Sequence, residues 1–94
     1  MELFVIRRRS AWASAEELER AAGRSSRVGT EEMSDQVRWI RSYVVQEEDG
    51  RLGTVFIYEA RDPEAIREHA RRADLQADEI VPVVRTVVVN EDPD

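Results

Sequence analysis

The sequence predicts a single α+β domain in which two helices pack against one face of a four-stranded antiparallel sheet. Two runs of β-branched and aromatic residues, 36–45 and 54–60, flank a polar turn and form a hairpin. One capped helical pattern precedes this hairpin and another follows it. Apolar runs beginning near residues 2 and 80 complete the order strand, helix, strand, strand, helix, strand.

The first strand is predicted at residues 2–8, where four consecutive apolar residues indicate burial on both faces. A helix should follow, because Ser14 and Glu17 have the spacing of a capping box. We expect this helix to end at Gly23. Residues 24–35 have little to bury and are predicted to form a loop.

The hairpin strands are predicted from alternation, since successive side chains of a regular strand point to opposite faces. Trp39, Tyr43 and Val45 are therefore expected on one face of the second strand. Asp49 and Gly50 are a strong signal for the turn between the strands. The same rule separates the third strand into one face with Phe56 and Tyr58 and another with Val55, Ile57 and Glu59.

The second helix is predicted to begin with Asp62 as the N-cap and Pro63 at the first helical position. A last strand is expected at residues 79–90, so the domain covers residues 1–90 and residues 91–94 form a polar tail. The side of this second helix that faces the sheet should carry Ile66, His69, Ala70 and Ala73.

This element order is that of the ferredoxin-like βαββαβ fold. Two helices cover only one face of the sheet, yet all four predicted strands carry apolar residues on both faces. An apolar surface of that size usually marks an interface. We therefore predict a homodimer that forms through the open sheet face.

Composition excludes several classes of function. The 94 residues include no cysteine, which rules out disulfides, thiolate metal sites and cysteine nucleophiles. The net charge of -6 argues against nucleic-acid binding, although all 14 basic residues are arginine. The chain holds no apolar stretch of membrane-spanning length, and we expect a cytoplasmic protein without a membrane partner.

A few polar side chains are candidates for chemistry, and none is assigned a catalytic role. His69 and Glu59 can meet if both face the helices, as a proton-transfer pair or as two metal ligands. The alternative is a hydrogen-bonded histidine in the core. The residues expected to line a small-molecule pocket, or otherwise to be core and interface side chains, are Trp39, Ser42, Tyr43 and Tyr58.

Several segments resemble one known family: residues 37–44 in the second strand, 58–60 and 63–73 across the third strand and second helix, and 75–80 beyond them. The chain is similar to a family of small ferredoxin-like proteins that is common in actinobacteria and includes a dimeric nickel-binding protein from Streptomyces. The resemblance implies a homodimer that binds or responds to nickel or another divalent transition metal. Glu59 and His69 are the ligands we expect.

Two other functions remain open from the sequence. Dimeric α+β proteins include small enzymes of the monooxygenase or isomerase type, in which His69 would act as acid or base and Tyr43 or Tyr58 would orient a substrate. A dimeric interaction module without a small ligand is the third possibility. An internal cavity near His69 favours the enzyme, and a filled core favours the interaction module.

Overall fold

The computed structural model describes residues 1–77 and 79–93, so residue 78 and the last residue of the predicted tail lie outside the described part. The predicted α+β architecture is confirmed, with a four-stranded antiparallel sheet and two helices. The elements are β1 (Glu2–Trp12), α1 (Ala15–Arg27), the π-helical turn η1 (Val28–Glu32), β2 (Val37–Gln46), β3 (Leu52–Ala60), α2 (Pro63–Ala73) and β4 (Glu79–Pro82).

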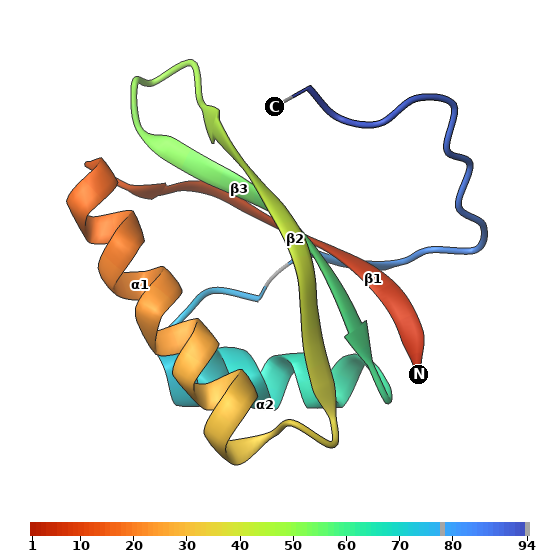
Figure 1. Ribbon diagram of the computed structural model, residues 1–94. Coiled ribbons are helices and arrows are strands. Elements are labelled where there is room, and N and C mark those ends of the chain that lie inside the picture. The colour runs from red at the N-terminus through yellow and green to blue at the C-terminus, as the bar shows by residue number, and fades with distance from the viewer. Residues whose placement is uncertain (78, 94) are drawn as a thin grey trace.

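The strands lie in the order β2-β3-β1-β4, and each neighbouring pair is antiparallel. Both helices lie on one side of the sheet, and the other face carries no helix (Figure 1). Within the described residues, no helix is both long and apolar enough to cross a bilayer. The main core between sheet and helices includes Phe4, Ile6, Phe56, Tyr58 and Ile66.

The helix boundaries follow the predicted capping chemistry. The Glu17 amide donates to Ser14 Oγ at 3.3 Å, and the amide of Ala13 donates to the Glu17 carboxylate at 2.8 Å. The N-cap of α2 is Asp62, whose carboxylate accepts from the Ala65 amide. These local signals therefore set where both helices begin.

The predicted end of the first helix at Gly23 is wrong, and so is the predicted loop over residues 24–32, whereas residues 33–35 do lie outside helices and strands. The helix α1 continues through Gly23 to Arg27, and one π turn follows in which the Met33 amide donates to the Val28 carbonyl at 3.0 Å. Val28 and Met33 are buried in the main core. Their burial outweighs the weak helix propensity of a single glycine.

The strand β2 contains a bulge that changes its two faces. Trp39 pairs with Tyr58 and Arg41 pairs with Ile57, so Ile40 is an extra residue without a partner on β3. Trp39 therefore faces the helices together with Tyr58, whereas Tyr43 lies on the open face. The prediction that Trp39 and Tyr43 share a face is wrong because it assumed a regular strand.

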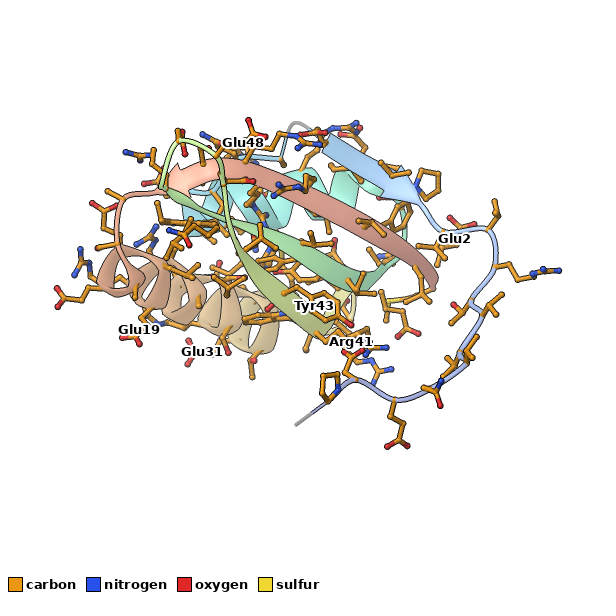
Figure 2. The ribbon with its side chains drawn as sticks, turned by 90° about the horizontal axis from the view of Figure 1, so that it is seen from above. Glu2, Glu19, Glu31, Arg41, Tyr43 and Glu48 are labelled. Atoms are coloured by element: carbon orange, nitrogen blue, oxygen red, sulfur yellow. The ribbon has the colours of Figure 1, made fainter. Side chains whose placement is uncertain are left out.

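The last strand is shorter than predicted: β4 ends at Pro82, and residues 83–90 form no strand. Pro82 pairs with Phe4 in an antiparallel register. Only residues 1–3 therefore remain for the residues after Pro82 to pair with. The Val83 amide donates to the Leu3 carbonyl, and the chain then leaves the sheet. Figure 2 shows this tail arching away and returning toward the labelled Tyr43.

Candidate functional site

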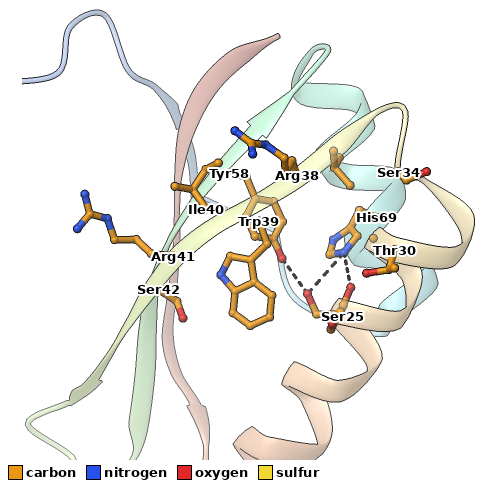
Figure 3. Close-up of a pocket in the computed structure, with 13 residues that line it drawn as sticks. Ser25, Thr30, Ser34, Arg38, Trp39, Ile40, Arg41, Ser42, Tyr58 and His69 are labelled. Atoms are coloured by element: carbon orange, nitrogen blue, oxygen red, sulfur yellow. Dashed lines mark hydrogen bonds between the residues drawn. The ribbon is translucent and has the colours of Figure 1, made fainter. Parts of the chain in front are cut away.

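A pocket of about 530 Å³ lies between the edge strand β2 and the segment formed by the end of α1 and η1 (Figure 3). Its inner wall includes the aromatic ring of Tyr58 and the imidazole of His69. Its remaining lining residues are Ser25, Ser26, Gly29, Thr30, Ser34, Val37, Arg38, Trp39, Ile40, Arg41 and Ser42.

Three buried polar side chains form a network at the inner end of this pocket. Ser25 Oγ and the Tyr58 hydroxyl share a hydrogen bond of 2.8 Å, and His69 Nε2 lies 2.9 Å from the Ser25 carbonyl oxygen (Figure 3). A carbonyl only accepts, so Nε2 carries the proton and donates it to this bond. Nδ1 is then a bare acceptor, and it is buried without a hydrogen-bond partner among the described residues.

The surroundings keep His69 and Tyr58 uncharged at neutral pH. Burial lowers the pKa of His69, the nearby Arg8 adds to this effect, and the bond to the Ser25 carbonyl opposes it. Burial also raises the pKa of Tyr58 above its ordinary value, against the opposing effects of Ser25 and Arg8. The site therefore presents a neutral imidazole and a neutral phenol, which bind a ligand through hydrogen bonds.

The pocket brings together four of the residues singled out from the sequence. Trp39, Ser42 and Tyr58 come from the sheet, and His69 comes from α2. Tyr43 does not join them, because the bulge turns it to the open face, where its hydroxyl donates to the Asp92 carboxylate. Its place in a shared pocket is therefore a wrong prediction.

Glu59 and His69 do not meet. Tyr58 faces the helices and contacts the imidazole edge to face, with ring centroids 5.3 Å apart. The next residue on β3 points to the opposite face by alternation, and Glu59 forms an ion pair of 3.1 Å with Arg38 there. The predicted pairing of these two side chains within one chain is therefore wrong.

The donor set of one chain does not fit a nickel site. Across residues 1–77 and 79–93, no three histidine, cysteine or acidic side chains are grouped closely enough to hold a metal ion. The imidazole of His69 uses Nε2 on a carbonyl, and its Nδ1 is enclosed. Nickel favours several imidazole or thiolate ligands, and the sequence offers one histidine and no cysteine.

Four hydroxyl-bearing residues of the pocket were missed by the sequence analysis: Ser25, Ser26, Thr30 and Ser34. All lie in the segment that was expected to be a loop. Their recurrence over ten residues is the only signal in the sequence. It becomes meaningful once helical geometry shows that they reach the same pocket.

The fold and the site define a small α+β protein with an open sheet face and one pocket between its edge strand and its first helix. A family model described as nickel responsive protein SCO4226-like matches residues 4–83, so the chain belongs to this family. The crystal structure of SCO4226 from Streptomyces coelicolor A3(2) superposes with a TM-score of 0.68 at 21% identity, over 90% of this chain and 99% of that one. This likeness shows a shared fold. No curated protein sequence matches the chain significantly.

Proposed function

We propose that this protein is a ferredoxin-like homodimer that binds a small molecule in the pocket between β2, α1 and η1. The observation that carries the proposal is the pocket itself. Its volume suits a small organic ligand, and it combines an aromatic wall with convergent hydroxyls and a neutral imidazole. An unfilled space beside His69 also favours a ligand-binding protein over an interaction module with a filled core.

Ligand binding can be tested with a pair of variants at Gly29. A Cβ at this position would lie 3.7 Å from His69 Nε2, an ordinary contact, so Gly29→Ala should leave the pocket open. Gly29→Leu should fill it. Benzamide, a neutral aromatic probe, is expected to raise the melting temperature of wild type and Gly29→Ala but not of Gly29→Leu. An equal shift in all three proteins, or no shift in any, contradicts the proposal.

The open sheet face supports the dimer. Tyr43 is 41% exposed and Val81 is 55% exposed on this face, and Val5 and Ile57 lie half-buried between them on the central strands. A contiguous apolar surface on one side of a sheet is stabilised when a second sheet packs against it. The same surface on both subunits makes a two-fold interface self-complementary.

The dimer can be tested by sedimentation. Ile57→Glu places a charge at the centre of the open face and should yield the 10.8 kDa monomer. Val44→Glu, on the other face opposite Thr54, is the matched change and should leave a species of about twice that mass. A wild type that sediments as a monomer at micromolar concentration rules out the dimer.

Nickel response is the second candidate function, and family membership supports it. Since the described residues of one chain lack a three-ligand group, a nickel site requires donors from both subunits. Nickel should then raise the melting temperature of chelator-treated wild type and strengthen dimerisation. His69→Ala should abolish both effects if the histidine is a ligand, and no response to nickel, cobalt, zinc or copper excludes this candidate.

A further inference from the structure

Residues 83–92, here called the valine tail, carry an apolar surface that no other part of the described chain covers. Four of its valines are between 69% and 99% exposed: Val84, Val87, Val88 and Val89. The family model matches residues 4–83, so nearly all of the valine tail lies beyond the matched domain. A run of β-branched residues with this exposure favours an extended chain that packs against another surface.

The strand β4 cannot continue into the valine tail within its own chain. It pairs with β1 as far as Pro82, which lies opposite Phe4, and the Val83 amide then donates to the Leu3 carbonyl at 2.9 Å. Beyond this point β1 has ended, because it begins at Glu2. The valine tail therefore has the composition of a strand and lacks a neighbouring strand, which a second chain can supply.

The strand β2 offers a free edge to such a segment. It spans ten residues and pairs only with β3 in the described sheet, so the main-chain groups of its outer edge have no strand beside them. The Asp92 carboxylate accepts from the Tyr43 hydroxyl at 2.5 Å and forms an ion pair with Arg41 at 3.0 Å (Figure 2). The edge strand β2 therefore complements the charged end of the valine tail.

The proposed face-to-face dimer brings the valine tail to this edge. A two-fold axis along the strands places β4 of each subunit over β2 of the other, because β4 and β2 are the two edges of the sheet. Packed sheets lie about 10 Å apart, a distance that three or four extended residues cross. Residues 83–86 can therefore bridge the sheets. Residues 87–92 then run antiparallel to residues 41–46 of the partner, since β4 is antiparallel to β2.

The open sheet face alone is small for a stable interface. Its four strands, about 4.8 Å apart and about eight residues long, cover roughly 500 Å². A stable interface buries about 800 Å² on each partner. The exposed valines and the main-chain hydrogen bonds along β2 would enlarge the contact at both edges of the two-fold dimer.

We propose that the valine tail of each subunit pairs as an additional antiparallel strand with β2 of a second copy, and that Asp92 binds Arg41 and Tyr43 of the partner subunit. This inference rests on the proposed homodimer and names the segments that hold it together. The contact found within one chain is replaced by the same contact between two chains, as in domain swapping. Because Arg41 also lines the pocket, the tail of one subunit borders the ligand site of the other.

Charge reversal distinguishes a contact between chains from a contact within one chain. Arg41→Asp and Asp92→Arg should each weaken the dimer about tenfold in sedimentation, because like charges then meet. An equimolar mixture of the two variants should recover the dimer, since every aspartate meets an arginine of the other chain while like charges remain within each chain. A mixture without recovery overturns the exchange. The chain with both substitutions, which restores the pair in either arrangement, is the matched control for folding.

Replacing three exposed valines tests the strand itself. The triple variant Val87→Ser, Val88→Ser, Val89→Ser should weaken the dimer at least tenfold, whereas the melting temperature of the dilute monomer should stay constant because these side chains are exposed in the single chain. An unchanged dimer that Ile57→Glu still dissociates overturns the exchange and leaves the face-to-face dimer intact. A stronger dimer shows that the valine tail covers the open face of its own chain, which also overturns the exchange. A monomeric wild type contradicts both proposals.

Discussion

The single histidine predicts a defined loss of stability in mild acid. His69 is 1% exposed, its Nε2 proton is donated to the Ser25 carbonyl, and its Nδ1 has no hydrogen-bond partner in the described part of the chain. A second proton would have to be placed on Nδ1, in the same buried layer as the guanidinium of Arg8. The folded chain therefore takes up this proton at a lower pH than the unfolded chain does.

The sign and size of the effect follow from this difference. The unfolded chain binds the proton near pH 6.5, so below that pH unfolding becomes more favourable. Each pH unit costs up to about 1.4 kcal/mol until the lowered pKa of the folded state is reached. Between pH 6.5 and pH 5.0 the free energy of unfolding should fall by at most about 2 kcal/mol.

Urea denaturation at several pH values in this window, followed by tryptophan fluorescence, measures the effect. His69→Gln removes the titrating group, and its free energy of unfolding should stay constant within about 0.5 kcal/mol. The carboxyls whose pKa values are lowered, those of Glu47, Asp49 and Glu68, titrate below the window in both proteins. Equal slopes for wild type and His69→Gln would refute the assignment of this loss to the histidine.

Four further changes test the packing and the helix cap by denaturation. Gly23→Ala should raise the free energy of unfolding by about 0.5–1 kcal/mol, since this helical glycine has open space around it. Gly53→Ala should lower the free energy of unfolding by about 1–3 kcal/mol, because the new Cβ would lie 2.6 Å from the Arg8 carbonyl oxygen. Ser14→Ala deletes the N-cap of α1 and should cost about 1 kcal/mol, seen as a melting temperature about 4–8 °C lower. Ile66→Ala leaves a cavity in the main core and should cost about 2–5 kcal/mol. An unchanged free energy of unfolding in any of these variants contradicts the structural reason given for that change.

Features that depend on neighbours in the chain were predicted well from the sequence. The caps at Ser14 and Asp62 and the turn before Gly50 are short-range arrangements of donors, acceptors and backbone freedom. The strand and helix order follows from them and from the spacing of apolar residues. The alternating pattern also separated Tyr58 from Glu59 correctly.

Features that depend on distant partners were not predicted. Whether residues 83–90 form a strand depends on how much of β1 remains to pair with them, which the valines themselves do not reveal. The face that Glu59 occupies depends on which side of β3 receives the helices. Arg8 follows an apolar run and looks like a solvated strand end, although tertiary packing encloses it. Burial of this kind can be recognised only in the folded structure, where the helices lie against the sheet.

The bulge at Ile40 places Trp39 and Ser42 on the same face of β2, although regular alternation would place them on opposite faces. Before the bulge, the ring of Trp39 lines the pocket. After the bulge, the side chain of Ser42 lines the same pocket, whereas Tyr43 points to the open face of the sheet. Without the bulge, with Ile40 paired in a regular ladder, the downstream half of β2 would turn over, bringing Tyr43 into the helix layer and Ser42 out of it. The bulge thus sets which side chains the edge strand presents on each face of the sheet, and the same sequence in a regular ladder would line a different pocket.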